Sequence, residues 1–231
     1  MATDPSTLPQ WKGKPVPWVA RWTQEKLVDK YGVSIVRDKG GYHLRVGYAD
    51  GNESREASGV LWQREGLQRG GEPMFGDVST YRQRDAMNRG KCQVCGTVIT
   101  SKLKPWIIEK FEIEAGRLDR IARGQDWHDY HLTTTPPVCE DCIPLAAELC
   151  PHLKKHGYQI LDVLEYEVWG VFGEVVFLEK DADGNPVPRR TQMSIGYNED
   201  YGESFSFESV LAKQQIVKIT KFKVREDKTK D

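Results

Sequence analysis

Two stretches carry the pattern that predicts the fold: RGKCQVCG, residues 89–96, and VCEDCIPLAAEL, residues 138–149. Each carries a Cys-x-x-Cys pair, and 43 residues separate the two pairs. In a reducing compartment, two such pairs are typical of metal ligands rather than of disulfides. Gly96 permits the tight turn of a zinc knuckle after the first pair, and the second pair stands where a helix should begin. We therefore expect one structural Zn²⁺ ion bound by Cys92, Cys95, Cys139 and Cys142.

A knuckle followed by a cysteine pair on the first turn of a helix is the layout of a treble-clef zinc finger. Four thiolates fill a tetrahedral ion, so the metal would serve as a scaffold. The alternative is that one pair is redox-active or simply buried. The fifth cysteine, Cys150, lies eight residues beyond Cys142. That is about 12 Å along a helix, so we expect Cys150 to be a core residue and not a ligand.

The patterning predicts an α+β fold with three consecutive regions. Residues 1–78 and 157–231 are expected to be rich in antiparallel β-strands, and they flank a zinc-binding region, 79–156. Strands are predicted at 16–22, 33–37, 42–48, 60–62, 158–168, 173–179, 191–197 and 216–225. Helices are predicted at 81–89, 114–123 and 143–155, with a short one at 206–213. Residues 38–41 are expected to form a hairpin turn, and 51–58 and 68–78 to form loops.

The composition of the 231 residues is that of a folded, nearly neutral protein. Lys and Arg number 33 against 34 Asp and Glu, and 39% of residues are hydrophobic. A protein held on DNA mainly by phosphate neutralisation normally has a clear basic excess. Local basic groups at 82–91 and 218–225 leave a DNA-binding regulator as an alternative. No apolar run reaches the ~18 residues of a membrane span, and the N-terminus lacks a secretory pattern. We expect a soluble, cytoplasmic protein without membrane contact.

The segment YRQRDAMNRGKCQVCG, residues 81–96, together with the cysteine pairs resembles zinc-stabilised HNH nucleases. That family carries a catalytic histidine between the pairs, usually in an Asp-His or His-His doublet, and an Asn and a further His or Asn complete its magnesium site. Here the histidines between the pairs are His128 and His131, without the doublet or the downstream Asn. They could form a magnesium cluster with Asp126 and Asp129, or simply lie on a loop. A divergent HNH-type nuclease is thus an alternative, and we expect no catalytic residues.

A second resemblance extends over most of the chain. It is carried by PVPWVARWT (15–23), GVLWQREG (59–66), RQRDAMNRGKCQVCG (82–96), PPVCEDCIPLAAELCPHL (136–153), EVWGVFGEVV (167–176) and VLAKQQIVKI (210–219). These segments look like a family of actinobacterial and actinophage proteins. Within it, the sequence is most similar to phage recombination directionality factors, which bind large serine integrases and switch them towards excision. The resemblance implies a non-enzymatic protein of the bacterial cytoplasm with an integrase partner, touching DNA only weakly or indirectly.

Overall fold

The computed structural model describes residues 7–28, 31–38, 41–53, 55–110, 112–113, 130–202 and 205–225. The chain forms two compact units. The first unit comprises Met1–Gln24, Arg69–Val168 and Val217–Asp231, and the second comprises Glu25–Gln68 and Trp169–Ile216. Each unit is therefore assembled from segments that are far apart in the sequence.

The first unit holds the helices and several short strands. Its elements are β1 (Gln10–Trp11), β2 (Lys14–Pro15), β3 (Ala20–Trp22), β7 (Pro73–Val78), α1 (Thr80–Arg89), β8 (Lys104–Glu109), β9 (His131–Thr133), η2 (Glu140–Cys142), α3 (Ile143–Leu149) and α4 (Pro151–His156). The start of β10 (Tyr158–Lys180) and the end of β12 (Val210–Val224) complete it. β8 pairs with β10, β9 with β12 and β3 with β7, all antiparallel.

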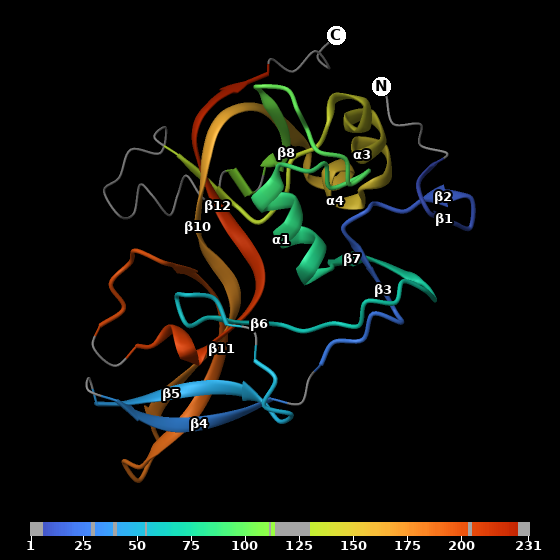
Figure 1. Cartoon of the computed structure of the whole chain (residues 1–231). Coiled ribbons are helices and arrows are strands. Elements are labelled where there is room, and N and C mark those ends of the chain that lie inside the picture. The colour runs from blue at the N-terminus through green and yellow to red at the C-terminus, as the bar shows by residue number, and fades with distance from the viewer. Residues whose placement is uncertain are drawn as a thin grey trace. The chain divides into compact units, whose positions relative to one another are not determined.

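The second unit is built from hairpins and a short 3-10 turn. Its elements are β4 (Tyr31–Asp38), β5 (Gly41–Tyr48), β6 (Leu61–Trp62), β11 (Pro186–Gly196), η3 (Phe207–Ser209), the end of β10 and the start of β12. β4 pairs with β5, and β10 with β11, in antiparallel register, whereas β6 lies parallel to β12. Figure 1 shows these two hairpins as the blue pair β4–β5 and the orange pair β10–β11.

The prediction of a mixed α+β protein that is rich in strands is confirmed. The predicted regions 1–78, 79–156 and 157–231 follow the chain in order, and the two compact units cut across them. The reason is that β10 and β12 each begin in one unit and end in the other. Of the described helices, none is long and apolar enough to cross a membrane.

Helix α1 begins and ends where the sequence indicates. The Ser79 side chain caps its N-terminus by accepting a hydrogen bond from the Arg82 backbone N–H. Gly90 ends it in the left-handed conformation, with φ at 60°, and its N–H donates to the carbonyl of Ala86. A residue with a side chain is strained at that φ, which explains why glycine marks the stop. This helix leads directly into the first cysteine pair.

The single helix expected at 143–155 is wrong. The structure breaks it into α3 and α4 at Cys150, which adopts an extended conformation with φ −80° and ψ 113°. Pro151 disfavours the helical conformation in the residue before it and lacks the N–H that would continue the helix. It therefore ends α3 and begins α4.

The separate strands expected at 158–168 and 173–179 form one strand of 23 residues, β10. The apparent gap between them contains Gly170 and Gly173. A Cβ on Gly170 would lie 1.9 Å from the Ile195 carbonyl oxygen, and one on Gly173 would lie 2.3 Å from that of Leu211. These glycines mark close approach of neighbouring strands and not a turn.

Several other boundaries differ from the expectation. β7 lies in a stretch predicted to be a loop, and β8 and β9 were not predicted. The short helix expected at 206–213 is only the turn η3, after which β12 begins. The predicted helix 114–123 and the centre of the turn 38–41 lie outside the described residues.

Candidate metal centre

The sulfur atoms of the four cysteines converge in the first unit. Their four sulfurs all lie within 4.8 Å of one another, and the sulfurs of Cys95 and Cys139 are 3.8 Å apart. With Zn–S bonds of ~2.3 Å, the sulfurs of an ideal tetrahedral site are about 3.8 Å apart. The four ligands predicted from the sequence can therefore hold one metal ion, and the donor set and spacing fit zinc.

The first pair is held by a tight turn. The Gly96 N–H donates to the carbonyl of Cys92 at 2.8 Å, and the Cys92 N–H donates to the carbonyl of Thr97 at 2.9 Å. Gly96 has φ of 78°, and a Cβ there would lie 2.8 Å from ring carbons of Trp18. Both the backbone conformation and the packed indole therefore require glycine at this position.

The second pair lies at the start of a helix. The Cys142 N–H donates to the carbonyl of Cys139 at 2.9 Å, and Cys142 is the residue that precedes α3. The two pairs are also tied together by the backbone, because the Gln93 N–H donates to the carbonyl of Pro137 at 2.9 Å. This bond holds the two pairs next to each other although 43 residues separate them in the sequence.

The cysteines are part of a hydrophobic core. Cys92 and Cys142 are buried, and Cys95 and Cys139 are half-buried. The buried apolar residues of the same cluster are Leu8, Val94, Ile99, Ile107, Val138 and Leu153. A metal ion bound by these cysteines would cross-link the two cysteine segments inside this cluster.

Close approach of the thiols makes their ionisation interdependent. Contact with Cys139 lowers the pKa of the Cys95 thiol and raises the pKa of the Cys142 thiol. Four thiolates in this space repel one another, so they cannot all ionise unless a cation neutralises them. A bound divalent ion would supply that neutralisation.

Arg225, which directly follows β12, stabilises the second pair from outside. The Arg225 guanidinium donates to Asp162 of β10, with Nε 2.9 Å from Oδ2, and to Glu140, with Nη1 2.9 Å from Oε2. Hydrogen bonds to Asp162 and Glu140 raise the pKa of Arg225 above its ordinary value. Glu140 lies between Cys139 and Cys142, so the arginine links the ligand segment to the sheet. No local pattern predicts this link, because its members are far apart in the chain.

The fifth cysteine stays outside the metal group. Among the described residues, the four predicted cysteines are the one set of three or more Cys, His, Asp or Glu side chains placed to share an ion. Cys150 instead packs, half-buried, against the same apolar cluster. The expectation that it is a core residue and not a ligand agrees with this placement.

Of the two histidines that the nuclease hypothesis uses, one lies among the described residues. His128, Asp126 and Asp129 lie outside the described residues. His131 is buried at 3% exposure on β9, and its Nε2 lies 3.8 Å from a carboxylate oxygen of Glu112. In the described part of the chain it therefore faces a carboxylate and joins no metal group.

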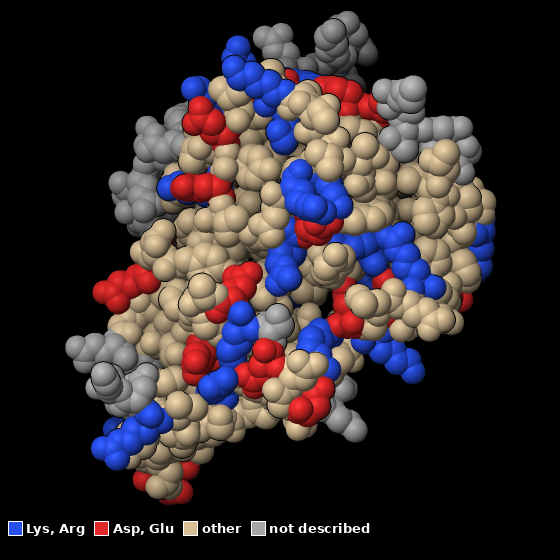
Figure 2. Space-filling model, viewed as in Figure 1, with Lys and Arg blue, Asp and Glu red and all other residues tan. Residues whose placement is uncertain are grey.

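Many of the basic side chains near the knuckle are engaged within the protein. Arg82 is buried and donates to the carbonyl of Ala20 at 2.8 Å. Lys91 pairs with Asp85 at 2.6 Å and lies over the ring of Trp18. On the face drawn in Figure 2, blue and red side chains are interspersed among wide tan areas.

The basic residues of the last strand are engaged in the same way. Lys218 lies over the ring of Tyr130, Lys221 pairs with Glu165 at 3.3 Å, and Arg225 is held by two carboxylates. Phosphate binding would have to compete with these internal contacts.

Comparison of the chain with protein-family models, with curated proteins and with solved structures finds no match.

Proposed function

We propose that this protein is a non-catalytic regulatory protein that holds one structural Zn²⁺ ion and acts by contact with a protein partner. The convergence of four cysteine sulfurs within 4.8 Å is the observation that carries the proposal. Four thiolates fill a tetrahedral zinc ion and leave no position for an activated water. The ion then contributes folding free energy and no chemistry.

A treble-clef arrangement of the centre is part of this proposal. A tight turn follows the first pair, with a bridge between Lys91 and Val98, and helix α3 follows the second pair. These are the local elements that a treble clef places around its ion.

The charge distribution supports a protein partner over a nucleic acid. The net charge is −1, and Lys91 after α1 and Lys218 and Lys221 on β12 already contact carboxylates or an aromatic ring. A surface of this kind gains little from the counterion release that drives binding to DNA.

The partner that we propose is a large serine integrase, with this protein as its recombination directionality factor. Six segments of the sequence resemble a family of actinobacterial and actinophage proteins. Within that family the sequence is most similar to recombination directionality factors, and this similarity supports the role. A factor that binds one arrangement of the integrase better than another shifts the equilibrium by that difference. About 3 kcal/mol of differential binding changes the ratio roughly a hundredfold.

The test is binding and recombination with the serine integrase encoded in the same genome. We expect the two proteins to migrate together in size exclusion, and we expect the protein to promote recombination between attL and attR sites. Failure in both assays would overturn the integrase role.

The other two functions predict different results. Cleavage of plasmid DNA with Mg²⁺, lost in His128→Ala or His131→Ala protein of normal zinc content, would support a nuclease. A salt-sensitive shift of a DNA fragment by the protein alone would support a DNA-binding regulator.

A further inference from the structure

The first unit contains an apolar cavity of about 220 Å³ beside the cysteine centre. Its walls come from the segment around β3, from β7, the knuckle, β8 and the α3–α4 break. The buried part of the lining includes Val19, Ala20, Val94 and Ile107. Phe75, which is 53% exposed, and His152, whose side chain is 67% exposed, mark where the cavity reaches the surface.

The helix side of this cavity is an apolar face that the described residues of the first unit cover only in part. Leu145, Ala146 and Leu149 of α3 line the cavity, and α3 has no fully buried residue. Positions i, i+1 and i+4 lie on one side of a helix, so these side chains form a continuous wall. Such a wall gains stability when a further apolar group fills the space beside it.

The size of the cavity selects a single side chain as its occupant. A volume of about 220 Å³ corresponds to roughly seven water molecules in the liquid. Sites for complete small-molecule ligands usually measure roughly 300–1,000 Å³. Interface hot spots, in contrast, are commonly one aromatic or aliphatic anchor that enters a pocket of the partner.

The lining of the cavity places negatively charged carboxylates next to a side chain that enters it. The lining includes the carboxylates of Asp77 and Glu109 and no lysine or arginine. Asp77 is already paired with Arg21 at 2.6 Å, whereas Glu109 has His152 Nδ1 at 3.9 Å. A cationic group that enters beside an apolar anchor would therefore meet the Glu109 carboxylate.

We infer that this cavity receives one large apolar side chain, preferably aromatic, from a protein partner that carries a Lys or Arg next to that side chain. The inference rests on the proposed role in protein–protein contact and assigns that contact to the face formed by α3, α4 and β7. The metal centre fixes the position of this face, because Cys142 leads directly into α3 and Val94 of the knuckle lines the cavity.

The first experiment uses three indole probes, one with a cationic side chain, one without a side chain and one with an anionic side chain. Tryptamine, indole and indole-3-propionate are titrated into the zinc-loaded protein and followed by two-dimensional NMR. We expect tryptamine to bind most tightly and indole-3-propionate most weakly, with shifts at Ile107, Ala146 and Leu149. Glu109→Gln should remove the preference for tryptamine over indole and leave indole binding in place. Absence of shifts at these residues with all three probes would overturn the cavity as a binding site.

The second experiment uses the partner. Ala146→Trp fills the cavity, and Leu67→Trp enlarges an apolar side chain that is 82% exposed in the second unit. We expect Ala146→Trp to weaken binding to the integrase at least tenfold and Leu67→Trp to leave it unchanged, with zinc content and melting compared for both.

The two proposals can fail separately. Integrase binding that survives in Ala146→Trp protein would overturn the cavity as the contact, whereas probe binding without integrase binding in the wild type would overturn only the integrase role. If Ala146→Trp does not fold, Glu109→Gln serves as the test, and it should reduce the affinity for the integrase.

Discussion

The two compact units differ in what stabilises each of them internally. The first unit has four cysteines built into one of its apolar core clusters, where their sulfur atoms converge. The second unit has a core of aliphatic and aromatic side chains, among them Trp62, Tyr197, Phe205 and Phe207, and no cysteine. The comparison teaches that the first unit should require metal and that the second should not.

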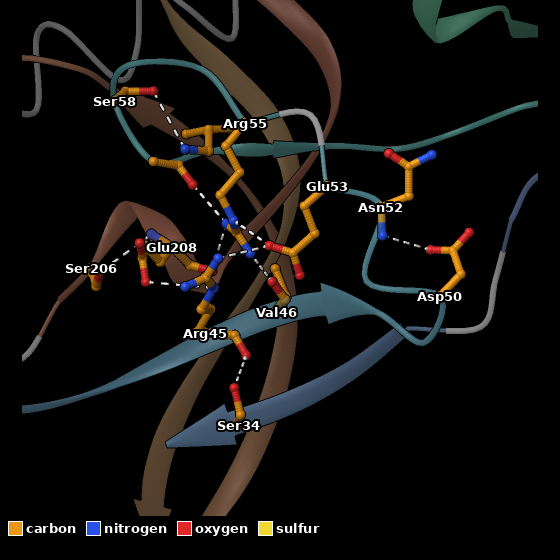
Figure 3. Close-up of polar contacts among 12 residues, drawn as sticks. Ser34, Arg45, Val46, Asp50, Asn52, Glu53, Arg55, Ser58, Ser206 and Glu208 are labelled. Atoms are coloured by element: carbon orange, nitrogen blue, oxygen red, sulfur yellow. Dashed lines mark hydrogen bonds and ion pairs between the residues drawn. The ribbon is translucent and has the colours of Figure 1, made fainter. Parts of the chain in front are cut away.

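In the second unit, a network of charged side chains connects segments of the chain (Figure 3). The Glu53 carboxylate accepts hydrogen bonds from Arg45 at 2.9 Å and from Arg55 at 2.8 Å. Arg55 also donates to the backbone carbonyls of Val46 and Gly59, and Glu208 lies 3.8 Å from Arg45. The network thus joins β5, the loop after it and η3 through charged side chains and two backbone carbonyls.

The largest expected effect comes from breaking the metal centre. Cys92→Ser, or removal of zinc with a chelator, should unfold the first unit, because structural zinc contributes on the order of 10 kcal/mol to folding. Hydrogen exchange should show loss of protection in α1, α3 and β8, with protection retained in β4 and β5. Cys150→Ser is the matched control, with full zinc content and near-normal melting. Zinc well below one ion per chain in the wild type would contradict the metal centre.

The next effect tests the packing of the second unit. Gly170→Ala places a Cβ against the carbonyl of Ile195, and we expect a loss of about 2–3 kcal/mol from the resulting strain. Gly32→Ala on β4 is the control, because a Cβ there meets no atom within 4 Å. Denaturant unfolding measures both, and equal stability of the two variants would refute the close approach of β10 and β11.

A smaller effect is expected from the charge network. Glu53→Gln should cost about 1–3 kcal/mol, because Arg45 and Arg55 lose a charged acceptor. The exposed pair Glu179–Arg189 provides the control, since both side chains are more than half exposed. Glu179→Gln should change stability by less than about 1 kcal/mol. Chemical denaturation with a probe in the second unit measures the difference.

The same network predicts a dependence on pH. Burial tends to raise the pKa of Glu53, but the hydrogen bonds from Arg55 and Arg45 lower it overall. A carboxyl with a lowered pKa stabilises the fold above its unfolded pKa and loses that contribution as the pH falls through its folded pKa. The stability difference between wild type and Glu53→Gln should therefore be full at neutral pH and shrink below about pH 4.5. A difference that grows on acidification would contradict this sign.

The smallest expected effect concerns the N-terminal cap of α1 in the first unit. Ser79→Ala removes the side-chain cap of α1 and should lower stability by about 1 kcal/mol. Ser79→Asp should preserve most of it, because a carboxylate also accepts from the first N–H groups of a helix. Thermal melting of the zinc-loaded protein compares the three, and a Ser79→Ala variant as stable as the wild type would argue against the cap.

Local chemistry explains which elements could be predicted. Helix α1 was predicted because Ser79 and Gly90 act within one turn of its ends. The β4–β5 hairpin was predicted because its residues alternate in type and pair with near neighbours in the sequence. The break before Pro151 was missed although proline is a local signal, because the apolar stripe on both sides favoured one continuous helix. Strands β8 and β9 were missed because they pair with β10 and β12, which are distant in the chain.

The candidate ligands were predictable because the spacing of each Cys-x-x-Cys pair fixes two sulfurs by local geometry alone. The sequence alone predicts the four ligand positions, a helix at 81–89 and the near-neutral charge. The tertiary structure decided the convergence of the two pairs, the burial of Arg82, the brace from Arg225 and the cavity beside α3. These depend on contacts between residues far apart in the chain, whose geometry is set by packing and not by any local preference of the backbone.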